Sequence, residues 1–229
     1  MARIYGIVGW MGSGKDTAAH YLVERYDWRQ VSFASTLKDA VAAVFHWPRQ
    51  LLEGRTPESR LWREQPDAWW SQRLNIANLT PRWVLQNVGT EVFRNHFHAD
   101  IWLARTERVI QHHLDQGHNV VVSDCRFANE FASIQEAGGR LIRISRDRVI
   151  PVWSACAATQ NNASADELAY LYNHNMTMDH LYPTVHASEW NWVGRPVSHV
   201  LDNTGTLDQL HQQLDQLVFA EFAHSEVAD

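Results

Sequence analysis

The sequence predicts an α/β fold in which a doubly wound parallel sheet carries helices on its faces. Short apolar runs alternate with segments of helical spacing along much of the chain, which is the order that successive βαβ units produce. A glycine-rich turn follows the first apolar run, and the run Asn119–Ser123 holds three consecutive valines. A run this apolar is typical of a strand that a parallel sheet buries on both faces.

Each predicted element follows from a local pattern. Small and apolar residues recur at helical spacing directly after the glycine-rich turn. Thr80 and Pro81 form a typical helix start, whereas Gly117 and Gly138 are typical of helix ends. The predicted strands are residues 3–8, 30–33, 119–123, 140–145 and 197–201. The predicted helices are residues 15–26, 37–45, 80–97, 101–116, 130–137, 165–172 and 207–222.

The composition excludes several classes of protein. Apolar residues make up 45% and charged residues 20% of the chain, which argues against wholesale disorder. A net charge of −6 disfavours a non-specific nucleic-acid binder, which would usually be basic. Two cysteines are too few for a disulfide-stapled secreted scaffold. Since neither a signal pattern nor a run of about 18 apolar residues occurs, we expect a cytoplasmic protein with no membrane span.

The segment Gly9–Lys15 fits the phosphate-binding pattern G-x-x-x-x-G-K and stands where that pattern must, between a strand and a helix. Glycines allow successive backbone N–H groups to wrap phosphates, and the helix N-terminus adds positive potential. Lys15 then contacts the β- and γ-phosphates. The alternative is a chance glycine-rich turn, which the flanking strand and helix disfavour.

The residue after Lys15 departs from the usual pattern, because Asp16 stands there in place of Ser or Thr and Thr17 follows. A hydroxyl at that place normally holds Mg²⁺. A carboxylate can bind the metal directly or through water, or Asp16 can simply complement the positive helix N-terminus. Both interpretations stay open, and we expect Mg²⁺ dependence with either.

A second group of polar residues follows the predicted strand 119–123. Asp124 ends this strand, and ligands of open α/β sheets bind at the carboxyl ends of strands. Arg126 can donate to a phosphate with both arms of its guanidinium. Glu130 stands four residues later, so the alternative for this group is a local Arg126–Glu130 ion pair of little consequence.

Two long segments, residues 47–100 and 147–197, interrupt the strand–helix alternation. No Asn-Lys-x-Asp motif indicates a small GTPase, and no apolar strand ends in Asp-Glu as in an ATPase motor. Phosphoryl transfer needs mobile segments that exclude water and clamp phosphates. The first segment and the start of the second carry arginines, of which we expect Arg82 and Arg146, directly before residue 147, to be phosphate ligands.

Short blocks occur in order along nearly the whole chain. They are Ser13-Gly-Lys-Asp-Thr17, Leu37-Lys38-Asp39, Leu85-Gln86-x-x-Gly89-Thr90, Trp102, Ser123-Asp-Cys-Arg126, Gly138-Gly-x-Leu-Ile-x-Ile144 with Arg146, His186-Ala-Ser-Glu189 and Asp202-Asn-x-Gly205. Together they resemble the bacteriophage deoxynucleoside monophosphate kinases. Each block alone is weak, but their order and spacing make the set specific.

The resemblance implies a P-loop kinase fold with a five-stranded parallel sheet, an acceptor-binding insertion and a lid. We therefore expect a single kinase domain, residues 1–229. Its core would comprise residues 1–46, 101–146 and 198–229, with the acceptor-binding insertion at 47–100 and the lid insertion at 147–197. The implied activity is Mg²⁺-dependent transfer of the ATP γ-phosphoryl group to deoxynucleoside 5′-monophosphates, which would supply precursors for phage DNA replication in the host cytoplasm.

The resemblance also implies site residues. The ATP phosphates would bind Gly12, Ser13, Gly14, Lys15, Asp16 and Thr17. The acceptor nucleotide would contact Lys38, Arg82, Gln86, Gly89, Thr90, Trp102, Asp124, Arg126 and Glu130. The catalytic residues would be Lys15, Arg126 and the lid arginine Arg146, and the Mg²⁺ ligands would be Asp16, Thr17 and Asp124. A homodimer is implied too, and direct nucleic-acid binding is not expected.

Some features limit what the resemblance transfers. The segment Val152–Tyr182 is an extra stretch, and the first insertion is unusually rich in Trp around Trp62, Trp69 and Trp70. Packing is a more common role than base stacking for such a group. The block His186–Glu189 either orders a closed lid or only forms a turn or helix cap. The remaining functional alternatives are a kinase of another small metabolite, similar to dephospho-coenzyme A kinase, and a non-catalytic nucleotide-binding protein.

Overall fold

The computed structural model describes residues 2–146 and 150–225, with side chains described as far as residue 220. The chain forms two compact units. The first comprises Met1–Val31 and Val109–Asp229, and the second comprises Ser32–Arg108. The segment 47–100 lies within the second unit, and the segment 147–197 belongs to the first.

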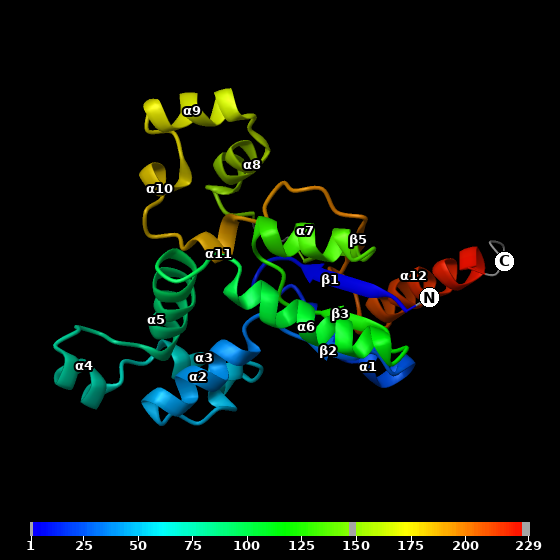
Figure 1. Cartoon of the computed structure of the whole chain (residues 1–229), viewed down its shortest axis with the longest axis horizontal. Helices are drawn as coiled ribbons and strands as arrows, with labels where there is room; N and C mark the ends of the chain where they lie inside the picture. Colours follow the sequence, from blue (N-terminus) through cyan, green and yellow to red (C-terminus); the bar gives the residue numbers. More distant parts are fainter. Residues whose placement is uncertain (1, 147–149, 226–229) are drawn as a thin grey trace. The chain divides into compact units, whose positions relative to one another are not determined.

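The first unit contains a parallel sheet of five strands in the order β2-β3-β1-β4-β5. Figure 1 labels β1, β2, β3 and β5 of this sheet. The strands are β1 (Ile4–Val8), β2 (Arg29–Val31), β3 (Val120–Val122), β4 (Arg140–Ser145) and β5 (His199–Asp202). The doubly wound, five-stranded parallel sheet is thus confirmed. Since all five strands run in one direction, the residues that follow their carboxyl ends gather at one edge, where such sheets bind ligands.

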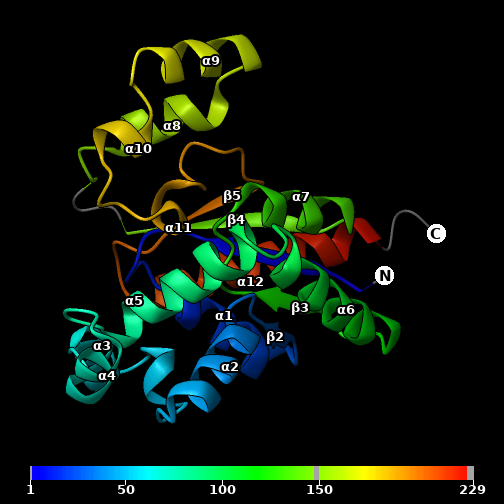
Figure 2. The same ribbon diagram turned by 60° about the vertical axis from the view of Figure 1, so that its left-hand side comes forward.

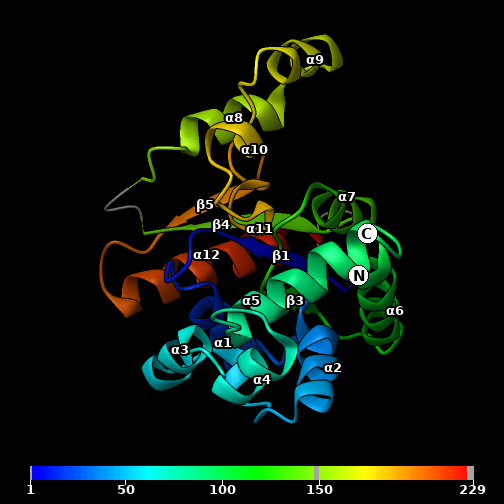
Figure 3. The same ribbon diagram turned by 90° about the vertical axis from the view of Figure 1, so that its left-hand side faces the viewer.

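Helices cover both faces of this sheet. Figure 3 shows α1 (Lys15–Tyr26) and α12 (Leu207–Ser225) below the sheet and α7 (Ala128–Glu136) above it. The lower face holds the main core, in which Tyr5, Ile7 and Ile142 from the strands pack against leucines of α1 and α12. On the other face Gly6 leaves room for α7, because a Cβ there would lie 3.3 Å from Ile134 Cγ1.

The segment 147–197 contains more helix than the single helix predicted at 165–172. The helices are α8 (Ser154–Asn162), α9 (Ala165–Asn173), α10 (Met178–Leu181) and α11 (Ala187–Trp190). Figure 2 shows α8, α9 and α10 grouped together beyond the sheet. A side-chain bond to the backbone links α8 to α10, since Gln160 Oε1 accepts from Met178 N at 2.6 Å. Asn161 Nδ2 of α8 donates in the same way to the carbonyls of Trp190 and Val193 at 2.8 and 2.9 Å. Such bonds leave no apolar periodicity in the sequence, which explains why α8, α10 and α11 were not predicted.

The second unit is helical. Its helices are α2 (Ser35–Phe45), η1 (Leu51–Glu53), α3 (Pro57–Glu64), α4 (Ala68–Leu74), α5 (Pro81–Gln86) and the π-helix η2 (Asn87–Asn95), and α6 (Ile101–Asp115) begins in it. The predicted helix 80–97 is therefore divided into an α-helix and a π-helix. The Thr80 hydroxyl accepts a hydrogen bond from Trp83 N, as its predicted capping role requires.

Tryptophans form much of the core of the second unit. Trp47 and Trp102 are buried there, and Trp62 and Trp70 pack against the same cluster. The indole N–H groups are also bonded, since Trp47 donates to Asp67 at 2.8 Å and Trp70 donates to the Phe45 carbonyl at 3.1 Å. Packing is thus the role that Trp62 and Trp70 have here. Trp69 differs, because 61% of it is exposed.

Within the described residues, no helix has both the length and the apolar character that crossing a membrane requires.

Candidate active site

The phosphate-binding loop joins the end of β1 to the start of α1, as the sequence pattern requires. Three of its glycines have backbone angles that favour glycine, with φ of +150° at Gly9, +79° at Gly12 and +102° at Gly14. A Cβ on Gly9 would lie 2.4 Å from the Ile144 carbonyl oxygen, so this turn passes too close to β4 for any side chain. The loop therefore brings its own backbone to the carboxyl edge of the sheet.

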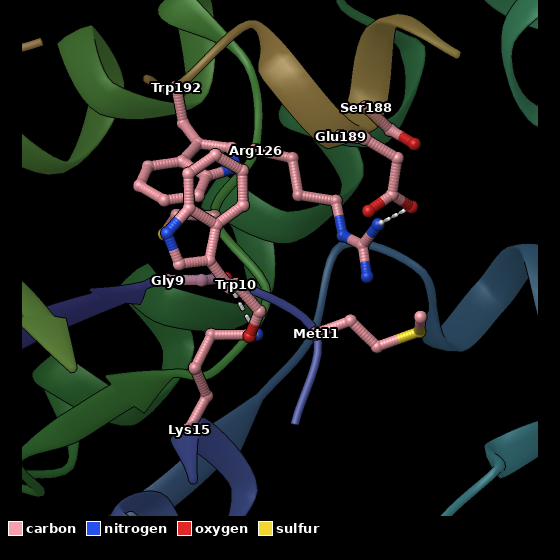
Figure 4. Close-up of a pocket in the computed structure, with 9 residues that line it drawn as sticks. Gly9, Trp10, Met11, Lys15, Arg126, Ser188, Glu189 and Trp192 are labelled. Carbon is pink, nitrogen blue, oxygen red and sulfur yellow. Dashed lines mark hydrogen bonds and ion pairs between the residues drawn. The ribbon is translucent and has the colours of Figure 1, made fainter. Parts of the chain in front are cut away.

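Lys15 is folded back onto this loop. Its Nζ donates to the carbonyl oxygens of Gly9 and Trp10, both at 2.8 Å (Figure 4). Burial, and after it the nearby positive charge of Arg126, lower the pKa of Lys15 from 10.5 to about 8. The ammonium group is thus partly stripped of water and poorly compensated, which is the state in which an added anion would bind it most strongly.

A small pocket adjoins the loop. Its lining residues are Gly9, Trp10, Met11, Lys15, Cys125, Arg126, Ser188, Glu189 and Trp192 (Figure 4). Arg126, from the turn between β3 and α7, directs its guanidinium into the pocket, and its Nη1 lies 3.5 Å from Glu189 Oε1. The pocket therefore brings two predicted catalytic residues, Lys15 and Arg126, into one small space with a carboxylate.

The residues from α11 to Trp192 form one wall of this pocket. Trp192 packs edge-on against Trp10 of the phosphate loop with ring centroids 4.5 Å apart, and the guanidinium of Arg143 lies 5.7 Å from the centre of the Trp192 ring. His186 caps α11, because its Nδ1 accepts from Ser188 N at 3.2 Å. The block His186–Glu189 thus includes a helix cap, as one interpretation expected, and also supplies the carboxylate that faces Arg126.

Several residues that line this pocket could not be predicted from the sequence. Glu189 was noticed only as part of a block, without a partner. Nothing in the spacing of Trp10 and Trp192 signals that they touch, because the contact joins segments that are far apart in the chain. Met11 and Cys125 lie beside predicted residues, but their types carried no indication of a site.

Glu130 has a structural role that was not predicted, in addition to its predicted contact with the acceptor. Its side chain is only 1% exposed, and Oε2 accepts from the backbone N–H groups of Arg126 and Phe127 at 2.7 and 3.1 Å. This carboxylate therefore closes the N-terminus of α7 and fixes the turn that carries Arg126. Any contact of Glu130 with an acceptor nucleotide stays a prediction.

The remaining predicted residues of the first unit lie at the same edge of the sheet. Asp16 and Thr17 are exposed in the first turn of α1, and Asp124 is half-buried directly after β3. Asp124 is close enough to Lys15 for its charge to favour the protonated lysine. Arg146 is exposed after β4 and is not among the residues that line the pocket in the part of the chain described.

The predicted acceptor residues of the second unit cluster around α5 and η2. Arg82 and Gln86 lie on α5, and Gly89 and Thr90 lie in the π-helix. Buried Trp102 donates its indole N–H to the Gly89 carbonyl at 2.9 Å. Lys38 forms an ion pair with Glu53 at 2.7 Å, and Arg82 lies 3.4 Å from Glu64. π-Helical segments are rare and are often found at functional sites. The acceptor contacts expected of this segment stay a prediction.

No protein-family model matches the chain. A protein of Acanthamoeba polyphaga mimivirus, assigned as a deoxynucleotide monophosphate kinase, is 34% identical over 153 residues. The match covers 62% of this chain and 74% of the viral protein. The chain belongs to the deoxynucleotide monophosphate kinase family. It is therefore a kinase-type phosphotransferase, and its phosphate-binding loop is that of a P-loop kinase.

Solved kinase structures are more distant from this kinase. Dephospho-CoA kinase from Campylobacter jejuni has 12% identity and a TM-score of 0.43, over 96% of this chain and 97% of that one. The APS kinase CysC of Mycobacterium tuberculosis has 14% identity and a TM-score of 0.43, over 95% and 97% of the two chains. Similarities this low carry no information about the substrate of the kinase.

The oxygen donors of the kinase suit a Mg²⁺ ion that arrives with a nucleotide. Among the described residues, no three His, Cys, Asp or Glu side chains are grouped closely enough to hold a metal ion by themselves. Mg²⁺ in nucleotide sites needs only one or two carboxylates, because water and phosphate oxygens complete its shell. Asp16, Thr17 and Asp124 offer hard oxygen donors of this kind, so the residues fit the metal.

The lowered pKa of Lys15 predicts how the kinase responds to pH. In the free enzyme Lys15 is protonated below about pH 8 and loses its charge above it, whereas an ordinary lysine stays charged to about pH 10. We expect kcat/KM for ATP to be level near pH 7, to be about halved near pH 8 and to fall about tenfold per unit at higher pH. Phosphate ionisation, with a pKa of about 6, does not produce this fall.

The measurement is a profile of kcat/KM for ATP at a saturating acceptor concentration. Arg126→Ala provides an internal control, because removing this neighbouring positive charge should move the fall to higher pH. A profile that stays level to about pH 10 would contradict the assignment of this ionisation to Lys15.

The cap role of Glu130 predicts a loss of stability on substitution. Glu130→Ala leaves two backbone N–H groups at the start of α7 without their acceptor, which should lower the free energy of unfolding by about 1–3 kcal/mol. Glu130→Gln is the matched control, because its amide oxygen can still accept and the loss should be smaller. Urea denaturation measures both, and equal stability of Glu130→Ala and the parent protein would refute the cap role.

Proposed function

We propose that this kinase transfers the γ-phosphoryl group of MgATP to a deoxynucleoside 5′-monophosphate and produces ADP and the deoxynucleoside diphosphate. The observation that carries the proposal is the meeting of Lys15 and Arg126 in one pocket beside the phosphate loop. One cation serves the phosphates of the donor, and the other can bind the phosphate of the acceptor. The substrate assigned to the mimivirus relative, a deoxynucleotide monophosphate, supports the same acceptor class.

The reaction requires little covalent chemistry from the protein. The attacking group is already an anionic phosphate oxygen, so no general base is required. Catalysis then consists of holding two phosphates in line and stabilising the charge on the transferring group. Bound Mg²⁺ would neutralise charge on the ATP phosphates, with Asp16, Thr17 and Asp124 as its protein ligands.

In this proposal the backbone of Gly12–Thr17 binds the ATP phosphates, and Lys15 contacts the transferring group. Arg126 binds the acceptor phosphate, and its present neighbour Glu189 leaves when that phosphate arrives, since two anions cannot share one guanidinium without cost. The segment 147–197 acts as the lid, and Arg146, which directly precedes it, contacts the phosphates.

The acceptor-binding insertion would supply the remaining contacts. The proposed ligands there, with Lys38 and Trp102 from the flanking helices of the second unit, are Lys38, Arg82, Gln86, Gly89, Thr90 and Trp102. Ion pairs with Glu53 and Glu64 already hold Lys38 and Arg82. An acceptor phosphate would have to compete with these carboxylates, so the cost of exchange favours an anion of high charge, such as a nucleoside monophosphate.

A panel of acceptors tests the proposal. ADP release from MgATP is measured with dAMP, dGMP, dCMP and dTMP, with the corresponding ribonucleotides and with dephospho-coenzyme A. We expect ADP release to depend on one or more of the deoxynucleotides and to require Mg²⁺. A response to dephospho-coenzyme A alone, or ATP binding without acceptor-dependent ADP release, would refute the proposal.

A further inference from the structure

A residue that neither the pocket nor the proposed chemistry includes makes direct contact with the phosphate loop. Asn203 follows β5 and lies 190 positions after Ser13 in the sequence. Its side-chain Nδ2 donates to the carbonyl oxygen of Ser13 at 2.7 Å. The contact therefore ties the last loop of the sheet to the peptide that precedes Gly14.

The phosphate loop has room for this amide only because residue 14 is glycine. A Cβ added to Gly14 would lie 2.3 Å from Nδ2 of Asn203, which is far inside van der Waals contact. The glycine thus serves two purposes, since its φ of +102° also favours glycine. The close approach indicates that the side chain of Asn203 is an integral part of the loop.

The backbone that carries Asn203 is itself fixed. Asn203 N donates to the Ser145 carbonyl at the end of β4 at 2.7 Å. Both backbone groups of Asp202 bond to the side-chain amide of Gln213 on α12, at 2.8 and 2.7 Å. The Asp202 carboxylate also accepts from Thr204 N at 2.9 Å. A rigid turn therefore presents the Asn203 amide to the phosphate loop.

Peptide geometry gives this contact a consequence for phosphate binding. In a planar trans peptide, the C=O of one residue and the N–H of the next point in opposite directions. Holding the Ser13 carbonyl on the Asn203 side therefore turns the Gly14 N–H to the other side. Backbone N–H groups are the phosphate ligands of such a loop, and donors that are already oriented bind without the cost of reordering.

We propose that Asn203 is a positioning residue of the kinase, which fixes the Ser13–Gly14 peptide so that the Gly14 N–H faces the phosphates of the donor nucleotide. The proposal rests on the proposed function in taking ATP as the donor. It adds that the residue acts through the loop, on the phosphates, and not on the base or the sugar.

Binding experiments with two ligands test whether Asn203 positions the phosphate loop. The affinities for MgATP and for magnesium tripolyphosphate, which lacks base and sugar, are measured by titration calorimetry on the full chain. Asn203→Ala removes the donor, and Asn203→Asp keeps the shape but places an ionised carboxylate beside the Ser13 carbonyl. Thr204→Ala is the matched control in the same turn, since its hydroxyl bonds to Asp202. Melting temperatures show whether each variant folds.

We expect Asn203→Ala to bind both ligands about tenfold more weakly and Asn203→Asp at least as weakly. Thr204→Ala should bind both within about twofold of the parent protein, and all three variants should melt within a few degrees of it. Weaker binding of MgATP with unchanged binding of tripolyphosphate would overturn the proposal, because the residue would then act on the nucleoside. Equal losses in Asn203→Ala and Thr204→Ala would also overturn it.

The role of Asn203 and the proposed function can fail independently of each other. If the parent protein binds MgATP and tripolyphosphate but transfers no phosphoryl group to a deoxynucleotide, the proposed acceptor is wrong and the role of Asn203 stands. If transfer occurs and Asn203→Ala binds tripolyphosphate as the parent does, the role of Asn203 is wrong and the function stands.

Discussion

Replacing Lys15 with alanine is expected to abolish turnover and to leave the fold intact. Lys15 is the cation of the phosphate loop, and its Nζ bonds only carbonyls of that loop among the contacts described, at 2.8 Å each. Removing one such group from the charge that develops in a transition state typically costs about 10²–10³-fold in rate. A loss of at least this size in kcat/KM is expected.

The fold should survive because the ammonium group is poorly solvated and weakly compensated, as its lowered pKa indicates. Its removal takes away an electrostatic cost along with two hydrogen bonds. The melting temperature is therefore expected to change by only a few degrees. Arg25→Ala is the matched control, because it removes an exposed cation from the last turn of the same helix. A Lys15→Ala protein that melts normally and retains kcat would refute the role of the loop in transfer.

Replacing Arg126 with alanine is expected to act chiefly on the acceptor. The guanidinium is 42% exposed, directed into the pocket, and held by Glu189 at 3.5 Å. A charge-assisted hydrogen bond is worth about 1.5–3 kcal/mol, so the acceptor KM should rise by about 10- to 100-fold. The KM for ATP should change much less.

Two further variants test whether the planar guanidinium of Arg126 and the carboxylate of Glu189 each affect the acceptor KM. Arg126→Lys keeps the charge but loses the planar fork, and its acceptor KM should lie between those of the parent and Arg126→Ala. Glu189→Gln removes the carboxylate that competes with the acceptor phosphate, so its acceptor KM should equal or fall below that of the parent. Steady-state kinetics with both substrates varied measures all three. An unchanged acceptor KM in Arg126→Ala would show that this arginine does not bind the acceptor.

The strands and the phosphate loop could be predicted because their signals are local. Three valines in succession, and glycines spaced around Lys15, identify a buried strand and a phosphate loop without any knowledge of neighbours. The carboxyl-edge rule then placed Asp124 and Arg126 beside that loop, and the pocket does hold Arg126 with Lys15. Local pattern and sheet geometry together were sufficient for this half of the site.

The unpredicted parts of the fold and of the site depend on contacts between segments that are distant in the sequence. The helices of 147–197 rest on side chains such as Gln160, which accepts from Met178 N at 2.6 Å, and polar residues of this kind leave no helical periodicity. Trp10 meets Trp192, and Asn203 meets Ser13, across most of the chain. The spacing suggested an ion pair between Glu130 and Arg126, and it did not predict the bond of Glu130 to the backbone of the turn.

Transfer of a labelled phosphoryl group tests the central claim most directly. The parent protein is incubated with Mg²⁺, ATP labelled in its γ-phosphate, and each deoxynucleoside 5′-monophosphate in turn, and the products are separated. The proposed function predicts that the label appears in the β-phosphate of at least one deoxynucleoside diphosphate, and that Lys15→Ala forms none of it. Label found only in ATP or in free phosphate, with every deoxynucleotide supplied, would contradict the proposed function.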